Sequence, residues 1–107
     1  LDAKVSNMEV FGPVVCVYSY DDLDQALDQA NSLPFAFQAS VFTKNLDIAM
    51  HAIKALDASA VMVNDHTAFR VDWMPFAGRK SSGLGVGGIL PSMIEMTEEK
   101  LIVFKKH

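Results

Sequence analysis

Apolar positions along the chain fall into short continuous runs separated by stretches with helical spacing. The runs at residues 13–20, 37–43 and 60–64 are rich in β-branched and aromatic side chains, which predicts three strands. In the two intervening stretches, apolar residues recur every three to four positions, as they do along one face of a helix. A strand, helix, strand, helix, strand order with short links is typical of parallel sheets. The pattern therefore predicts an α/β fold built on a parallel βαβαβ sheet.

Both predicted helices start at a residue whose side chain can accept hydrogen bonds from the free N–H groups of a first helical turn. Asp21 or Asp22 holds this position before the first helix, and Asn45 holds it before the second. Asn31 and Ser32 are expected to end the first helix.

The second half of the chain shows a different pattern. From residue 65 to about residue 91 there is little periodicity, and five of the six glycines fall in this segment. A loop of that length is uncommon in a compact domain and usually has a function. A short helix near residues 92–96 and a last strand at residues 101–105 are expected after this long Gly-rich loop.

Composition and charge exclude several classes of partner. The formal net charge is −4 and no basic stripe is visible, so no nucleic-acid partner is expected. No apolar run approaches the roughly 18 residues of a membrane span, so no membrane partner is expected either. Cys16 is the single cysteine, which excludes an intrachain disulfide and fits a reducing, cytoplasmic location. Because free cysteines are often buried, we expect Cys16 in the core.

Two apparent ligand motifs are weak. Residues 83–88 match G-x-G-x-x-G, the dinucleotide fingerprint, but lack the preceding strand and the acidic residue about 20 positions later. A flexible or tightly turning loop accounts for these glycines better. His51 and His66 have no Cys, His or carboxylate partner at metal spacing, so no metal site is predicted.

Two other clusters carry candidate chemistry. Glu9 and Phe11 precede a Gly-Pro turn, which can place a carboxylate and a flat ring at the end of a strand. A carboxylate can accept both hydroxyls of a ribose, while a ring packs against a nicotinamide or sugar face. A solvated glutamate with a core phenylalanine is the alternative. The second cluster is residues 74–83, in which Pro75 restricts the backbone before the aromatic residue Phe76, and a basic pair and small residues follow. Such a loop can place one ring firmly while its backbone turns tightly. The alternative is a loop that only closes the base of a sheet.

In order along the chain, these clusters and three further segments resemble the carboxyl-terminal part of the aldehyde dehydrogenase superfamily. The sequence has EVFGPV at residues 9–14, ASVFT at 39–43, VN at 63–64, PFAGRKSSGLG at 75–85 and TEEK at 97–100. Each motif alone is modest, but the five occur in the family's order over nearly the whole chain. The resemblance implies a catalytic-domain segment at residues 1–99 and an oligomerisation strand with a tail at residues 100–107.

The resemblance also implies roles for particular side chains. Glu9 would bind the ribose of the nicotinamide half of NAD or NADP, and Phe11 would pack beside that half. Phe76 and Phe69 would line the pocket for the aldehyde substrate. The strand at residues 101–105 would pair with a neighbouring subunit in a homo-oligomer, because an unpaired strand edge favours association.

The same resemblance implies that the catalytic residues are absent. The family's nucleophilic cysteine, general base and oxyanion donor lie upstream of this segment, and Cys16 follows FGPV, so it is not that nucleophile. The chain begins with Leu1 rather than Met, which fits a piece of a larger protein. We expect a fragment of an NAD(P)-dependent aldehyde dehydrogenase that is inactive alone. The alternatives are a non-catalytic α/β interaction module and an acyl-phosphate reductase of the same superfamily.

The chain departs from the family pattern at three places. Ala77 replaces a glycine, residues 85–87 read Gly-Val-Gly where Gly-Arg-Glu is common, and Met8 replaces a glutamate. These changes bear on loop geometry and substrate preference. Arg70 points to an aldehyde with an anionic tail, since arginine can clamp a carboxylate or phosphate, and an ion pair with Asp72 is the alternative.

Overall fold

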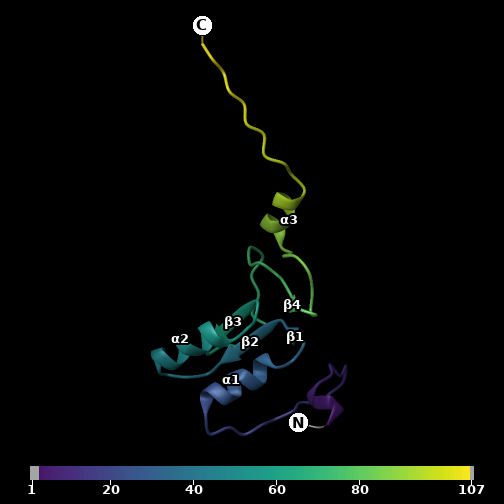
Figure 1. Cartoon of the computed structure of the whole chain (residues 1–107), viewed down its shortest axis with the longest axis vertical. Helices are drawn as coiled ribbons and strands as arrows, with labels where there is room; N and C mark the ends of the chain where they lie inside the picture. Colours follow the sequence, from purple (N-terminus) through teal and green to yellow (C-terminus); the bar gives the residue numbers. More distant parts are fainter. Residues whose placement is uncertain (1–2, 107) are drawn as a thin grey trace.

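The computed structural model describes residues 3–106, in which two pairs of short strands and three α-helices form the regular elements (Figure 1). In chain order, the elements are the 3₁₀-helix η1 (Lys4–Ser6), α1 (Leu23–Asn31), β1 (Phe35–Ala36), β2 (Gln38–Val41), α2 (Leu46–Ala55), β3 (Ala60–Val63), β4 (Arg79–Lys80) and α3 (Ile89–Glu95). Within residues 3–106, none of the helices has the length and apolar character needed to cross a bilayer.

A parallel βαβ unit forms the centre of the molecule. Strand β2 runs parallel to β3 in a register that pairs Gln38 with Ala60 and Val41 with Val63. Helix α2 connects the two strands, as the apolar spacing predicts. The second and third predicted strands and the helix between them are therefore confirmed, with strand bounds shorter than predicted by up to three residues.

The two predicted helix starts are also confirmed. Helix α1 begins after Asp22, whose Oδ1 atom accepts a hydrogen bond from the Gln25 backbone N–H at 2.9 Å. Helix α2 begins after Asn45, whose Oδ1 atom accepts from the N–H groups of Asp47 and Ile48 at 2.8 and 3.3 Å. In both cases a short polar side chain replaces the intrahelical partner that the first turn lacks.

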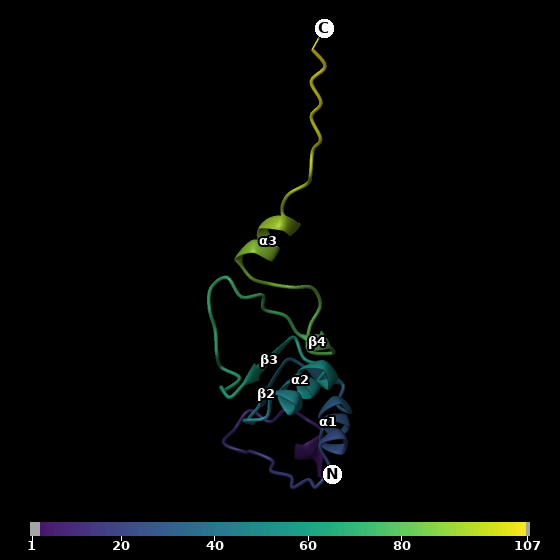
Figure 2. The same cartoon turned by 90° about the vertical axis from the view of Figure 1, so that its left-hand side faces the viewer.

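The small core lies where the two helices meet the parallel strands. Among residues 3–106, the buried apolar side chains are Leu27 of α1, Ala49 and Ala52 of α2, and Met62 of β3. Viewed from the side, α1 and α2 lie on the same side of β2 and β3 (Figure 2). A layer of helices on one face of the strands thus supplies the packing that fixes this part of the chain.

The predicted first strand is wrong for this chain. Residues 13–20 have no regular secondary structure and pass below α1 as an extended, exposed segment (Figure 1). The side chains of Val15 and Val17 are 85% and 87% exposed. A strand needs a neighbouring backbone for its ladder of hydrogen bonds, and none of the described residues supplies one. The parallel sheet therefore has two strands instead of the predicted βαβαβ arrangement.

The predicted Gly-rich loop contains regular structure. Strand β4 lies inside it and pairs antiparallel with β1, with Phe35 opposite Lys80 and Ala36 opposite Arg79. Phe76 and Gly87 form an isolated antiparallel bridge, and α3 starts at Ile89, earlier than the predicted residue 92. The segment was predicted as structureless because β4 has only two residues, both polar, and shows no hydrophobic period.

The carboxyl-terminal segment extends away from the rest of the chain. After α3, residues 97–106 form no helix or strand and point outward (Figure 1). The predicted strand at residues 101–105 is therefore not formed within this chain, again because no described strand lies beside it. The radius of gyration is 19.2 Å, compared with about 13 Å for a compact domain of this size.

Candidate functional site

A hollow of about 660 Å³ lies between the amino-terminal segment, the β1 region and the loop that carries Phe76. Glu9 and Phe76 both line it, so the structure brings together the two residues that the resemblance assigns to the cofactor and the substrate. The remaining lining residues are Val5, Ser6, Asn7, Met8, Leu33, Phe35, Ala36, Phe37, Gly78, Ser81 and Ser82. Aromatic rings and small polar groups thus face one space, as in many ligand pockets.

The Phe76 ring is held from two sides. The ring of Phe37 meets it edge to face, with the centroids 5.0 Å apart and the planes at 79°. The guanidinium carbon of Arg70 lies 4.7 Å from the centroid of the Phe76 ring. The backbone is fixed as well, because Phe76 and Gly87 exchange two N–H···O hydrogen bonds of 2.9 and 2.7 Å.

Arg70 carries a positive charge that no carboxylate of the described residues neutralises. Its Nη1 atom makes one long hydrogen bond, at 3.5 Å, to the carbonyl of Met74. Within residues 3–106 its guanidinium forms no ion pair, so the alternative pairing with Asp72 does not occur in this part of the chain. The guanidinium therefore retains donors for an anion beside the Phe76 ring.

The Glu9 carboxylate is equally open. Glu9 follows η1 in an irregular, exposed stretch that ends in the Gly-Pro turn, where Val14 N–H donates to the Gly12 carbonyl at 2.8 Å. No hydrogen bond or ion pair from residues 3–106 reaches its side chain. An acceptor without a partner among the described residues suits a ligand that brings hydroxyl donors.

Two other predicted residues lie outside this hollow. The side chain of Phe11 is 94% exposed and does not line the hollow. Phe69 is 42% exposed and is likewise absent from the lining. In contrast, Phe37 was missed as a site residue, because its position at the start of a predicted strand gave it a structural explanation.

The prediction for Cys16 is wrong. Its thiol is exposed and makes only a weak contact, 3.7 Å from the carbonyl of Val5, because the strand that was expected to bury it does not form. His51 pairs with Asp24 across α1 and α2, and His66 Nε2 lies 3.8 Å from the carboxylate of its neighbour Asp65. Within residues 3–106, no three metal-ligating side chains of the His, Cys, Asp and Glu types gather at one place.

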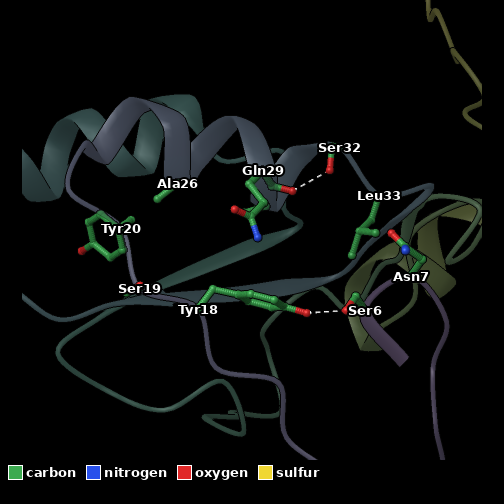
Figure 3. A pocket seen from close by; sticks show the side chains of 10 residues that line it. Ser6, Asn7, Tyr18, Ser19, Tyr20, Ala26, Gln29, Ser32 and Leu33 are labelled. Atoms are coloured by element: carbon green, nitrogen blue, oxygen red, sulfur yellow. Dashed lines mark hydrogen bonds between the residues drawn. The ribbon is translucent and has the colours of Figure 1, made fainter. Parts of the chain in front are cut away.

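A second, smaller hollow of about 310 Å³ lies between α1 and residues 18–20 (Figure 3). Tyr18 runs along its floor and donates a hydrogen bond of 2.7 Å from its hydroxyl to Ser6 Oγ. Gln29 projects from α1 toward this ring (Figure 3). Ser6, Asn7 and Leu33 line both hollows, so the amino-terminal segment forms part of a wall that the two spaces share.

Sequence comparison identifies relatives that match nearly the whole chain. Residues 1–102 match the aldehyde dehydrogenase family. The chain is 42% identical over 102 residues to 3-sulfolactaldehyde dehydrogenase of Priestia aryabhattai, a match covering 95% of this chain and 21% of the relative. It is 37% identical over 102 residues to lactaldehyde dehydrogenase of Methanococcus aeolicus, covering 95% and 22%. The chain thus spans about a fifth of the length of the curated relatives it matches.

Solved structures give the same result. NADP-dependent glyceraldehyde-3-phosphate dehydrogenase from Bacillus halodurans C-125, complexed with NADP, matches with a TM-score of 0.86 and 39% identity, covering 92% of this chain and 21% of that one. Aldehyde dehydrogenase 21 from Physcomitrella patens, in complex with the reaction product succinate, gives 0.85 and 36% over the same shares. An NAD⁺ complex of aldehyde dehydrogenase from Bacillus cereus gives 0.76 and 32%, covering 79% and 17%.

These matches agree with the five motifs, the parallel βαβ unit and the helices that flank it. The family match covers well over half of the chain, and two of the three solved structures described above are complexes with NADP or NAD⁺. The chain belongs to the aldehyde dehydrogenase family.

Proposed function

We propose that this chain is the carboxyl-terminal part of an NAD(P)-dependent aldehyde dehydrogenase that oxidises an anionic aldehyde to the corresponding acid. Its residues would form one wall of the active site, and the nucleophile would come from another part of the complete polypeptide. The observation that carries the proposal is the shared hollow, in which Glu9 and Phe76 face the same space. By itself, the 107-residue chain is expected to be inactive.

The residues of the hollow fit the nicotinamide half of NAD or NADP. The Glu9 carboxylate, which has no partner among residues 3–106, can accept hydrogen bonds from the two ribose hydroxyls, while aromatic side chains offer flat apolar surface. Phe11, exposed two residues beyond Glu9, is proposed to pack beside the same group. When bound, the cofactor supplies a hydride acceptor for aldehyde oxidation. The protein residues would bind and orient it.

The aldehyde itself is proposed to be recognised by Phe76, Phe69 and Arg70. The Phe76 ring supplies an apolar wall, and the guanidinium beside it supplies a cation that can bind a carboxylate, phosphate or sulfonate. The names of similar proteins support this chemistry, since they include 3-sulfolactaldehyde, glyceraldehyde 3-phosphate and the product succinate. Lactaldehyde, named for another relative, carries no anionic group and is the competing substrate class.

Assembly into a homo-oligomer is proposed through the carboxyl-terminal segment. Leu101 and Phe104 are 89% and 92% exposed, and residues 101–105 carry backbone groups without a ladder partner in the described chain. Pairing with a neighbouring subunit would satisfy these groups and cover the apolar side chains.

The first experiment is an aldehyde panel on the complete polypeptide that contains this segment. The panel compares sulfonate, phosphate, carboxylate and uncharged aldehydes of similar length, each with NAD and with NADP. We expect the highest kcat/KM for the anionic aldehydes. Activity on none of these compounds would contradict the proposed function, and a preference for the uncharged aldehydes would contradict the anionic class alone.

The second experiment replaces Glu9 with glutamine in the same polypeptide. The amide keeps the size of the side chain but loses the charge that strengthens hydrogen bonds from ribose hydroxyls, an effect of about 1.5–3 kcal/mol. We expect the cofactor KM to rise or hydride transfer to slow, by about tenfold or more. Asp47→Asn, an exposed carboxylate on α2, serves as the matched control. Unchanged kinetics in the Glu9 variant would remove this residue from the site.

A further inference from the structure

The Lys80 ammonium of β4 makes two hydrogen bonds and one ion pair with distant parts of the chain. Its Nζ atom donates to the carbonyl of Asn31 at 2.6 Å and to the carbonyl of Leu33 at 3.1 Å. It also lies 3.6 Å from Oδ2 of Asp57. The ammonium therefore uses two of its three donors in hydrogen bonds, while the Asp57 carboxylate balances its charge. The Lys80 side chain is only 29% exposed, in keeping with this fixed position.

The acceptors of Lys80 are themselves joined to one another. The Asn31 amide donates to the Ala55 carbonyl at 2.8 Å, and its Oδ1 atom accepts from Asp57 N–H at 2.8 Å. Asp57 also pairs with Arg79, with Nε and Oδ1 3.0 Å apart. The network therefore ties the end of α1, the link between α2 and β3, and strand β4 into one unit. Asn31 is the last residue of α1, where a cation is favoured by the helix dipole.

The backbone at Lys80 is strained, which indicates that its contacts hold it in place. Its φ angle is +52°, a left-handed conformation that costs energy for any residue except glycine. Two residues earlier, a Cβ added at Gly78 would lie 2.5 Å from the backbone of Ser82. The turn is thus unusually tight, and the side-chain network opposes its opening.

Two further hydrogen bonds attach the tight turn to the β1 region, which lines the proposed active site. Ser81 N–H donates to the Pro34 carbonyl at 2.9 Å, and Ala36 N–H donates to Ser82 Oγ at 3.0 Å. Strand β1, held in this way, ends one residue before Phe37, whose ring packs against Phe76. The β1–β4 ladder has only two residue pairs, so it is a weak attachment without the side-chain anchor.

We propose that Lys80 is a positioning residue for the aldehyde pocket. By fixing β4 against the end of α1, it sets the place of β1 and of the loop 76–87, and through them the contact between Phe37 and Phe76. This inference rests on the proposed function, because the Phe76 ring is taken there as a wall of the substrate pocket. Lys80 itself does not line the hollow.

The kinetic test uses the complete polypeptide with Lys80→Met, which keeps the length of the side chain and removes the three donors. A wall misplaced by about 1 Å can cost on the order of a hundredfold in rate. We expect the KM for the aldehyde to rise about tenfold or more and the KM for the cofactor to rise less, because Glu9 lies outside the contacts that Lys80 makes. Lys80→Arg, which restores a cationic donor, should recover most of the loss.

A purely stabilising role would give a different result in the same assay. It would lower the fraction of active enzyme and hence the apparent kcat, with both KM values unchanged. That outcome, or a Lys80→Arg variant as impaired as Lys80→Met, would overturn the inference. Lys54→Met is the matched control, because Lys54 is an exposed lysine on α2 whose side chain makes no hydrogen bond or ion pair with residues 3–106.

Hydrogen exchange of the complete polypeptide gives a second readout that does not depend on activity. Lys80→Met should speed exchange in residues 79–82, where Ser81 N–H is bonded to Pro34, and leave the amides of β2 and β3 unchanged. Unchanged exchange at 79–82, or an equal increase in β2 and β3, would overturn the inference. If the wild-type protein oxidised no aldehyde, the proposed function would fail, and exchange would still decide whether Lys80 anchors this loop.

Discussion

Arg70 is the residue on which the proposed substrate class depends. Replacing it with glutamine removes a charged donor that is worth about 1.5–3 kcal/mol in a hydrogen bond to an anion. For anionic aldehydes we therefore expect kcat/KM of the complete polypeptide to fall about 10- to 100-fold. The measurement is steady-state kinetics with a carboxylate or sulfonate aldehyde.

An uncharged aldehyde of the same length gives the internal control for this variant. Its kcat/KM should change by less than about threefold, because the Phe76 ring, 4.7 Å from the guanidinium, stays in place through Phe37 and the Gly87 bridge. Equal losses for both aldehydes would mean that Arg70 supports the loop and does not select the substrate. Arg70→Lys should recover only part of the activity, since an ammonium lacks the planar fork.

At the scale of elements, α2 depends on its amino-terminal cap. Asn45→Ala removes the acceptor for the N–H groups of Asp47 and Ile48, and we expect the free energy of unfolding to fall by about 1 kcal/mol. Urea unfolding of the complete polypeptide measures this change. Asn45→Asp keeps an acceptor and should be close to wild type. Equal losses in both variants would show that the missing acceptor is not the cause, and an unchanged Asn45→Ala variant would show that the cap contributes nothing.

The turn before β4 gives a second prediction at this scale. Gly78→Ala would place a methyl group 2.5 Å from the backbone of Ser82, so the turn must open, at a cost of about 1–3 kcal/mol. Gly12→Ala is the control, because a Cβ at Gly12 meets nothing within 4 Å. Differential scanning calorimetry should show a lower Tm for the first variant alone; matching values would contradict the close approach.

Local signals account for the elements that were predicted correctly. Helices α1 and α2 carry their own caps and apolar faces, and β2 and β3 are short apolar runs on either side of a helix. Residues 13–20 have the same local signal, but a strand also needs a partner, which the sequence of the segment cannot reveal. Strand β4 is the opposite case. Its sequence has no apolar period, but it forms a strand because β1 lies beside it.

The candidate site was predictable only where a motif marked it. The resemblance placed Glu9 and Phe76 in one site, and the structure places them on one hollow. Phe37 and the Lys80 network were missed, since their contacts join residues far apart in the chain, 49 positions in the case of Lys80 and Asn31. No spacing rule connects a polar loop residue to a helix end at that distance.

At the scale of the whole molecule, the chain exposes a large apolar surface. The valines of residues 13–20 are exposed, and so are Val103 and Phe104, at 78% and 92%. The buried core of the described residues is small by comparison. We therefore expect the 107-residue chain alone to self-associate through these segments. Size-exclusion chromatography with light scattering should give at least twice the chain mass of 11.7 kDa. A well-behaved monomer would contradict this expectation.

The loop 76–87 is closed at its base by the two hydrogen bonds between Phe76 and Gly87, whereas the buried side chains belong to α1, α2 and β3. The loop that is proposed to contact the substrate and the elements that carry the buried side chains are thus different stretches of sequence. A lineage could exchange one aldehyde for another by altering this loop while the helices stay as they are. For an engineer, residues 65–88 are accordingly the stretch to graft from a relative of different specificity.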